Sequence, residues 1–247
     1  MDRSQILFRA SQVGRLMTEP RSKSEILSET TKEYCREVYI NVKYGRKKDI
    51  TNKYIQKGLM VEEDSITLLS RFKKQMFRKN ETRLQNEYIT GTPDLFIGEN
   101  IEEAIHVIDA KSSWDIFTFY KAKSEEINKL YYWQLQSYMW LTGAKSADLV
   151  YCLINTPDVL ITDQKRKFMW NAGILDENPI TDEVFAEIEK DCLFDDIPLS
   201  ERIHIKPVEY CESDIERLKI RIEDCRDYIE SLFETKIHNE QLQIELS

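Results

Sequence analysis

The feature that most limits how this chain can fold is a change in sequence texture between residues 83 and 155. Short segments rich in β-branched and apolar residues, separated by glycine, proline and asparagine, predict a small antiparallel set of strands over 83–90, 94–98 and 104–111. An apolar run typical of a buried strand follows at 147–154. Because helical periodicity lies on both sides, the order predicts an α/β (α+β) domain with a central mixed β-sheet flanked by helices.

The flanking helices are predicted from apolar residues that recur every three or four positions. We expect a helix over 25–43 that ends at Gly45, and a longer helix over 51–78 that begins at Thr51 or Asn52. The other elements predicted in this way are helices over 115–142, 157–171, 181–191 and 212–235, and a strand over 202–206.

Length and composition predict one domain, since the chain has 247 residues of which 41% are hydrophobic. Within it we distinguish a helical N-terminal part (1–82), a core part (83–155) and an acidic, mainly helical C-terminal part (156–247). The sequence contains no membrane-length apolar run, no recognisable signal peptide, and five scattered cysteines without a Cys-x-x-Cys pair. These features predict a cytoplasmic protein without membrane association, and they weigh against zinc and iron–sulfur sites.

Charge is unevenly distributed along the chain, whose net charge is −9. Residues 165–247 hold 11 basic and 21 acidic residues, whereas the window 43–83 holds 12 basic and 5 acidic residues. That basic window, which includes Lys47, Lys48 and Lys53, is typical of a surface that follows a phosphate backbone. It is equally typical of a solvated helix face.

Two carboxylates and a lysine are expected to meet in the core part. Asp109 and Lys111 lie two positions apart at the end of an apolar run, so a strand presents both side chains on one face. Upstream, Asp94 follows the turn Gly91-Thr92-Pro93, and a hairpin between the two runs would bring it beside Asp109. Aspartates can ligate a hard divalent cation, while a lysine orients water or offsets phosphate charge.

Two helical segments add polar residues to this group. Glu62 lies three residues after Leu59 and four before Ile66, on an apolar stripe, so we expect it to face inward and to need a partner such as a metal ion. Gln134 and Tyr138 are four residues apart and therefore neighbours on one helix face. An inward glutamine among aromatic side chains needs a polar target.

The ordered set predicts a site that holds a divalent metal ion and activates water against a phosphodiester. Its candidate catalytic residues are Glu62, Asp94, Asp109, Lys111, Gln134 and Tyr138. Nucleophilic Ser/His/Asp and Cys/His sets, and glycine-rich phosphate loops, find no support in the sequence.

These motifs resemble those of the PD-(D/E)XK nuclease superfamily, and within it the YqaJ / lambda-exonuclease type of viral recombination nuclease. The matching pieces are Gly58-x-x-x-Glu62, Gly91-Thr92-Pro93-Asp94, Asp109-Ala110-Lys111 and Gln134-x-x-x-Tyr138. The short stretch Arg9-Ala10-Ser11 is similar to the segment that meets the terminal 5′-phosphate in such exonucleases.

The resemblance implies a restriction-endonuclease-like core and one or two Mg²⁺ or Mn²⁺ ions. Asp94, Asp109 and the carbonyl of Ala110 would hold the metal, with Glu62 supporting or ligating it. Lys111 would orient the nucleophilic water, and Gln134 and Tyr138 would line the site. Family members often carry Glu where this chain has Asp109, which leaves the number and geometry of the metal ions open.

The chain is therefore expected to be a metal-dependent DNA exonuclease acting 5′→3′ on duplex ends in phage-type recombination or DNA processing. Its expected DNA contacts are Arg9, Ser11, Lys47, Lys48 and Lys53. The alternatives are an endonuclease on the same core and a catalytically silent nucleic-acid-binding or assembly protein. The resemblance also implies a homo-oligomer, a ring-shaped trimer by analogy, and a single-strand annealing protein as partner.

Overall fold

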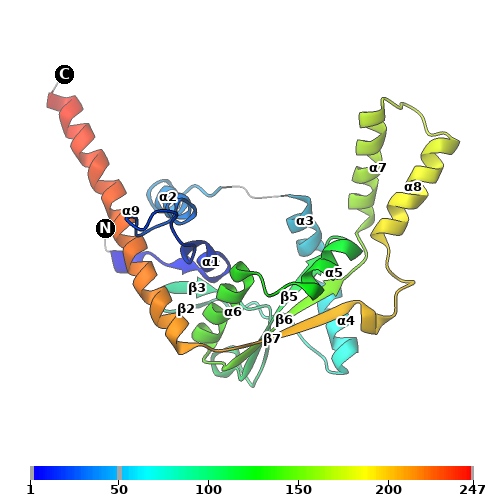
Figure 1. Ribbon diagram of the computed structural model, residues 1–247, viewed down its shortest axis with the longest axis horizontal. Helices are drawn as coiled ribbons and strands as arrows, with labels where there is room; N and C mark the ends of the chain where they lie inside the picture. The colour runs from blue at the N-terminus through cyan, green and yellow to red at the C-terminus, as the bar shows by residue number, and fades with distance from the viewer. Residues whose placement is uncertain (1–2, 49–51, 246–247) are drawn as a thin grey trace.

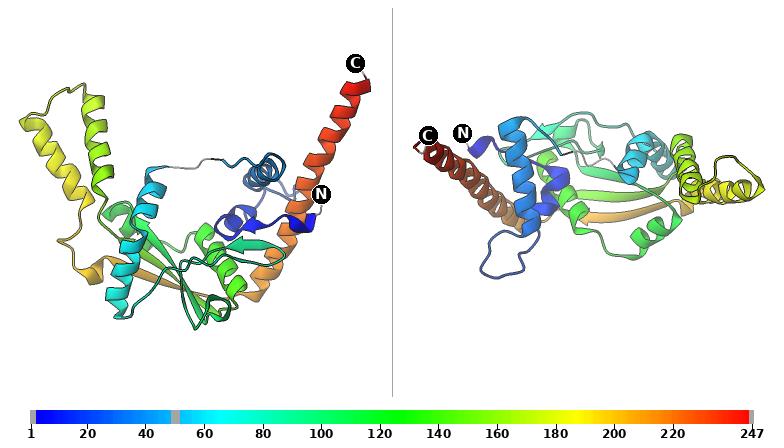
Figure 2. Two further views of the ribbon diagram at one scale, coloured as in Figure 1. Left: turned by 180° about the vertical axis from the view of Figure 1, so that it is seen from behind. Right: turned by 90° about the horizontal axis from the view of Figure 1, so that it is seen from above.

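The structure, a computed structural model, describes residues 3–48 and 52–245 of the chain (Figure 1). Two helical arms rise from the same side of a body that contains a mixed sheet. One arm is the pair α7 (Asp158–Ala172) and α8 (Pro179–Cys192), and the other is the long helix α9 (Glu212–Glu245). The arms give the molecule the outline of an open U (Figure 2).

Among the described residues, four strands form the central sheet, in the order β4-β5-β6-β7. They are β4 (Leu95–Ile97), β5 (His106–Ser113), β6 (Ser146–Leu153) and β7 (Ile203–Glu209). β5 and β6 pair in parallel, whereas β4 with β5 and β6 with β7 are antiparallel. The predicted mixed sheet is therefore present, and its parallel pair is connected through α5 (Ile116–Ser124) and α6 (Lys129–Thr142).

The core lies on both faces of this sheet because successive strand residues point to opposite sides. Val107 on β5 packs in the cluster that contains Leu135 of α6. Its neighbour Ile108 packs in the opposite cluster with Leu69 of α4 (Glu62–Lys73). This alternation directs the side chain of Asp109 toward α6.

A second, smaller sheet has the order β1-β3-β2. Its strands are β1 (Phe8–Arg9), β2 (Leu84–Gln85) and β3 (Ile89–Gly91), with β1 parallel to β3. The prediction of one antiparallel set over 83–111 was wrong, since segment 83–90 forms a β2–β3 turn region apart from the β4–β5 hairpin. The side chain of Asn86 makes this turn by accepting from the amides of Tyr88 and Ile89.

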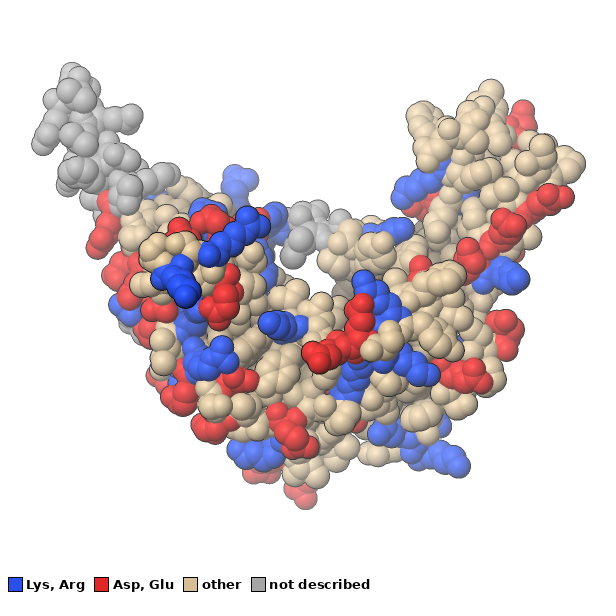
Figure 3. Space-filling view, viewed as in Figure 1, with Lys and Arg blue, Asp and Glu red and all other residues tan. Residues whose placement is uncertain are grey.

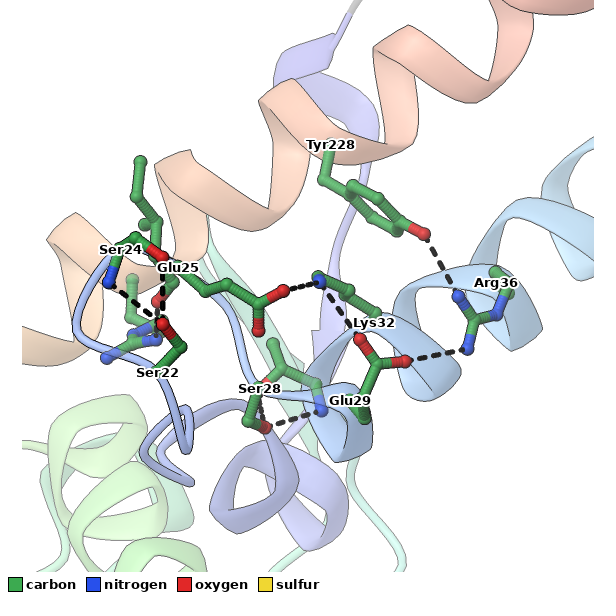
Figure 4. A network of polar contacts seen from close by, with 11 residues as sticks. Ser22, Ser24, Glu25, Ser28, Glu29, Lys32, Arg36 and Tyr228 are labelled. Carbon is green, nitrogen blue, oxygen red and sulfur yellow. Dashed lines mark hydrogen bonds and ion pairs between the residues drawn. The ribbon is translucent and has the colours of Figure 1, made fainter.

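The N-terminal part contains η1 (Arg3–Gln5), η2 (Ala10–Gln12), α1 (Val13–Leu16) and α2 (Glu29–Tyr44). α2 ends at Gly45, as predicted, because Gly45 adopts a left-handed conformation with φ 63° that few other residues tolerate. α2 also packs against α9, and Figure 4 shows Arg36 donating to the hydroxyl of Tyr228 while Lys32 pairs with Glu25 and Glu29.

Helix α9 also fastens the small sheet to the body. The guanidinium of Arg226, which is 4% exposed, donates to the carbonyl of Ile6 just before β1 and to the carbonyl of Glu87 between β2 and β3. A buried arginine that satisfies two backbone carbonyls is costly to remove. Segments that are more than 200 residues apart in the sequence are thereby joined, since this contact spans 220 positions.

The predicted helix over 51–78 is interrupted at Val61, which separates α3 (Lys53–Met60) from α4. Asn52 caps α3 by accepting from the amides of Tyr54 and Ile55, whereas Thr51 lies outside the described residues. The predicted helix over 115–142 is likewise two helices, α5 and α6. Leu59 is 71% exposed, so the stripe used to orient Glu62 does not continue across the break.

The remaining predicted elements are present, including α7, α8, α9 and β7, and short 3₁₀ turns lie at η3 (Ile101–Glu103) and η4 (Leu199–Glu201). Within the described ranges, none of the helices combines the length and apolarity needed to cross a membrane.

Candidate active site

Asp109 and Lys111 lie on the face of β5 that looks toward α6. The side chain of Asp109 is fully buried, and its Oδ2 lies 2.6 Å from Nζ of Lys111. Among the described residues, no further group donates a well-oriented hydrogen bond to this oxygen. The predicted sharing of one strand face is confirmed, and it produces an ion pair between the fully buried Asp109 and Lys111, whose side chain is 25% exposed.

Asp94 joins this pair through the predicted β4–β5 hairpin, whose register sets Leu95 opposite Ile108. Oδ2 of Asp94 accepts from the backbone amide of Ala110 at 3.0 Å. Asn80 fixes the turn before Asp94, because its side-chain amide donates to the carbonyl of Pro93 at 2.9 Å and its backbone amide to the carbonyl of Asp94 at 2.8 Å.

The three charges of this cluster do not balance. Burial, reinforced by the charge of Asp109, raises the pKa of Asp94 to about 7. Burial by itself would lower the pKa of Lys111, but the charges of Asp109 and Asp94 outweigh it and raise that pKa. Lys111 is therefore an ammonium at neutral pH, and two carboxyl groups, the buried one of Asp109 and the half-buried one of Asp94, face one cation.

Gln134 and Tyr138 reach the cluster from α6, where both are buried. The side-chain amide of Gln134 donates to Oδ1 of Asp109 at 2.9 Å and to the hydroxyl oxygen of Tyr138 at 3.0 Å. Burial and then the charges of Asp109 and Asp94 raise the pKa of Tyr138, which keeps its phenol neutral. The predicted inward glutamine thus finds its polar target.

Glu62, by contrast, does not face inward as expected. Its side chain is 24% exposed at the first turn of α4, and its Oε2 accepts from Nζ of Lys79 at 2.7 Å. The physical reason is the break at Val61, which resets the helical phase. Glu62 nevertheless lies near enough to Asp94 for its charge to help raise the pKa of that carboxyl.

The donor set fits a hard divalent cation, although no group of three or more His, Cys, Asp or Glu side chains in the described part of the chain is arranged to hold one. Asp94 and Asp109 offer carboxylate oxygens, and Ala110, directly after Asp109, offers a carbonyl, the ligand types that Mg²⁺ and Mn²⁺ prefer. The raised pKa of Asp94 and the under-satisfied Oδ2 of Asp109 both indicate that this cluster has too little positive charge for its carboxylates.

Beside Tyr138 lies a cavity of about 200 Å³, here named the Arg9 cavity. It is lined by Arg9, Ala10, Ser11, Arg83, Thr90, Gly91, Thr92 and Tyr138. The guanidinium of Arg83 is held in place because its Nε donates to the hydroxyl of Thr90 at 2.9 Å. Arg83 was absent from the predicted contacts, and its membership in the basic window was its only sequence signal.

Gly91 is needed for this packing. A Cβ at position 91 would lie 2.8 Å from Cβ of Ala10 and 2.9 Å from Cε1 of Tyr138, closer than real Cβ contacts allow. The glycine therefore lets η2, β3 and α6 approach one another. The structure thus brings Arg9-Ala10-Ser11 next to Tyr138, although the two segments are far apart in the sequence.

The three lysines expected to contact DNA are placed differently from one another. Lys48 pairs with Glu33 and Glu37 of α2 and does not reach the aspartate cluster, and Lys47 is exposed between α2 and α3. Nζ of Lys53 lies 4.7 Å from the ring centre of Trp114, which follows β5. Figure 3 shows Lys and Arg side chains around the hollow between the two arms, interspersed with acidic ones.

Comparison with known proteins bears on the fold. No protein-family model and no curated protein matches this sequence. Among solved structures, it is similar to a phage-related exonuclease from Haemophilus somnus 129PT, with a TM-score of 0.72, 26% identity, and coverage of 93% of this chain and 96% of that one.

An alkaline exonuclease from Laribacter hongkongensis has a TM-score of 0.64 at 14% identity, with 98% of this chain and 95% of that one covered. Its complex with dAMP has a TM-score of 0.63 at 15% identity, with 99% and 96% covered. The second and third likenesses concern the fold alone. In fold and in the order of its motifs, the chain resembles the lambda-exonuclease type of PD-(D/E)XK nuclease.

Proposed function

We propose that this chain is a metal-dependent DNA exonuclease that hydrolyses phosphodiester bonds 5′→3′ from duplex ends. The observation that carries the proposal is the cluster that Asp94, Lys111 and Gln134 form around the buried carboxylate of Asp109. It lies in a fold shared with a phage-related exonuclease over nearly the full length of both chains.

Asp94, Asp109 and the Ala110 carbonyl would hold Mg²⁺ or Mn²⁺, and Glu62 would join them if it left Lys79. Such an ion, when bound, polarises a phosphoryl oxygen and lowers the pKa of water. Asp109 is buried and Asp94 half-buried, so their carboxylates are shielded from water, which strengthens their attraction for a cation.

Lys111, Gln134 and Tyr138 would contribute as hydrogen-bond donors. Because the pKa of Lys111 is raised, it serves as a donor to the attacking water or to a phosphate oxygen and does not act as a base. Gln134 fixes the carboxylate of Asp109 by holding Oδ1. The hydroxyl oxygen of Tyr138 accepts from Gln134, which leaves the phenolic hydrogen free to donate to substrate.

The Arg9 cavity supports action at ends over internal cleavage. Two arginines and the hydroxyl of Ser11 line it beside Tyr138, and such groups bind a terminal phosphate well. Because a terminal phosphate exists only at a strand end, these lining residues favour an exonuclease over an endonuclease.

The test is degradation of end-labelled linear duplex beside a covalently closed circle, with Mg²⁺, with Mn²⁺ and with EDTA. Metal-dependent loss of the linear DNA alone, with early release of a 5′ label, is expected. Nicking or linearisation of the circle would identify an endonuclease. Persistence of both DNAs with either metal would identify a catalytically silent binding protein.

Assembly and partners remain predictions from the resemblance. A homo-oligomer, ring-shaped and trimeric, needs apolar surface between subunits, and Trp170, Leu175 and Ile180 on the α7–α8 arm are 86%, 93% and 71% exposed. Sedimentation of the purified chain tests the oligomer. Co-purification with a single-strand annealing protein tests the partner.

A further inference from the structure

A second cavity, of about 330 Å³, opens beside Lys111 and is not used by the proposed chemistry. We name it the Trp114 cavity. Its aromatic lining consists of Tyr54, Trp114, Tyr131 and Tyr151, and its polar lining includes Lys111, Ser112, Lys121, Glu125, Glu126 and Asn128. Four aromatic side chains around one opening is an unusual surface for a water-exposed cavity.

Three of these four aromatic side chains are accessible to a ligand, whereas Tyr151 is only 7% exposed. Trp114 and Tyr131 are half-buried, and Tyr54 is 55% exposed. The rings of Tyr54 and Trp114 meet edge to face, with their centres 5.4 Å apart. Nζ of Lys53 lies over both rings, 5.2 Å from the centre of Tyr54 and 4.7 Å from that of Trp114, so a nucleobase could stack only on the ring surface that borders the cavity.

Trp114 is held firmly at this opening. Lys57, which is 1% exposed, donates from Nζ to the carbonyl of Trp114 at 2.8 Å. Nζ of Lys57 also lies 5.7 Å from the centre of the Trp114 ring, and Nζ of Lys53 lies 4.7 Å from it. Helix α3 therefore positions the tryptophan by a backbone contact and two cation–π contacts.

The Trp114 cavity adjoins the aspartate cluster through Lys111. Nζ of Lys111 contacts Asp109 and also lies 5.2 Å from the ring centre of Tyr131. Strand β5 then continues for two residues toward Trp114, about 10 Å beyond Lys111 at the usual rise of a strand. In Figure 1 the elements of this cavity, α3 and α5, lie to the right of α6, whereas β3 of the Arg9 cavity lies to its left.

We infer that the Trp114 cavity binds a nucleobase of an unpaired DNA strand, on the side of the scissile phosphate away from the Arg9 cavity. The inference rests on the proposed function, since it names how that same site would hold its substrate. The charges of Glu125 and Glu126 offset those of Lys111 and Lys121 in the lining, so the cavity does not favour a phosphate, whereas its aromatic rings attract any base through its π-face. The cavity thus suits a base and tolerates different sequences.

The test is equilibrium binding without catalysis. A 5′-phosphorylated single-stranded oligonucleotide is titrated with the protein in EDTA, either intact or with one abasic nucleotide moved stepwise from the second to the fifth position. The intact strand should bind about 5- to 100-fold tighter than the strand that is abasic at the second or third position. For Trp114→Ala this difference should vanish.

Matched variants separate stacking from folding. Trp114→Phe should keep most of the difference because it retains a ring. Phe117→Ala removes a 76% exposed aromatic of α5 that lies outside the cavity lining, and it should behave like wild type. Thermal unfolding of each variant accompanies the titrations.

Equal affinity of the wild-type protein for intact and abasic strands, or no measurable binding, would overturn the inference. So would a Trp114→Ala variant that weakens binding to both strands equally, because the tryptophan would then act only through the fold. Cleavage with Mg²⁺ is scored separately. Base-dependent binding without cleavage rejects the nuclease alone, and cleavage without base dependence rejects the stacking site alone.

Discussion

Gln134 binds Asp109 across 2.9 Å, from the interior of a helix to the interior of a strand, and both side chains are buried. The same amide nitrogen donates to the hydroxyl of Tyr138, so both of its hydrogens are used. The carboxylate of Asp109 is thereby fixed in rotation, with Oδ2 directed at Lys111. One uncharged side chain therefore sets the orientation of the charged pair.

Replacing Gln134 by alanine should slow DNA cleavage by about 10- to 100-fold, the usual effect of losing a group that orients a metal-binding carboxylate. Single-turnover cleavage measures this rate. The matched control is Gln136→Ala on the same helix. Gln136 is also buried but bonds the backbone of Glu209 and Cys211, so its loss should cost stability and leave the rate per folded molecule unchanged. Equal rates for the two variants would contradict the assigned role.

Asp94→Asn should stabilise the metal-free protein above about pH 7. The pKa of Asp94 is about 7 in the fold and near 3.8 otherwise, so between these values the folded state holds a proton that the unfolded state has lost. Stability therefore falls as the pH rises through this window. In EDTA at pH 8 the variant should melt on the order of 5 °C higher, with no advantage near pH 4. A lower melting temperature at pH 8 would show that Asp94 is not under electrostatic stress.

Added Mg²⁺ or Mn²⁺ should raise the melting temperature of the wild-type protein and have little effect on Asp94→Asn. A cation that binds only the folded state stabilises it by mass action. Binding should also strengthen as pH rises through about 7, because the cation displaces the proton of Asp94. Calcium-free buffer with a matched concentration of Na⁺ controls for ionic strength. An equal shift in both proteins would place the metal elsewhere.

Lys111→Gln should reduce cleavage by about 10²- to 10³-fold, the typical cost of removing one donor aimed at developing charge. The variant also loses the partner of a buried carboxylate, so folding is checked by thermal unfolding. Lys167→Gln, an exposed lysine of α7 that lines neither cavity, is the control for charge alone. Because the pKa of Lys111 is raised, the wild-type rate should show no loss near neutral pH from deprotonation of this lysine.

Gly91→Ala should destabilise the protein by about 1–3 kcal/mol, since the new methyl group would overlap Ala10 and Tyr138. Gly58→Ala is the control, because nothing lies within 4 Å of a Cβ there. In the middle of α3 it should be neutral or stabilising by roughly 0.5–1 kcal/mol. Urea unfolding of both variants measures these changes in the free energy of unfolding. The same destabilisation at both sites would mean that Gly91 matters only through backbone freedom.

Arg83→Ala should reduce the preference for a 5′-phosphate over a 5′-hydroxyl at the DNA end. The arginine lines the Arg9 cavity and is oriented by Thr90, so its removal takes one charged donor from the terminal phosphate. Competition between the two kinds of end, in one reaction, measures the preference. Arg71→Ala, which lies on α4 outside that cavity, should leave it unchanged. An unaltered ratio in Arg83→Ala would exclude the cavity from end recognition.

Local sequence patterns predicted the part of the site that local structure builds. Strand alternation predicted that Asp109 and Lys111 share one strand face. The turn residues before Asp94 predicted the hairpin that brings Asp94 to the backbone amide of Ala110. Four-residue spacing was enough to pair Gln134 with Tyr138. Each of these relations depends on neighbours within one element or one hairpin.

Local sequence patterns did not predict the features that depend on tertiary packing. Apolar periodicity continues through Val61, so the sequence did not predict the break between α3 and α4. For the same reason it did not predict the half-exposed position of Glu62. β1 is two residues long and leaves no period to detect. Arg83 and Trp114 gain their surroundings from segments distant in the sequence, which no local pattern encodes.

The contacts of Arg226 also determine when the small sheet can gain its full set of contacts during translation. The small sheet that carries Arg9 is fastened to a side chain 220 positions downstream of Ile6. On a ribosome, β1 and the β2–β3 turn emerge long before that arginine does. The Arg9 cavity therefore gains this support only after residue 226 has left the ribosome, later than the β5 hairpin with its aspartates.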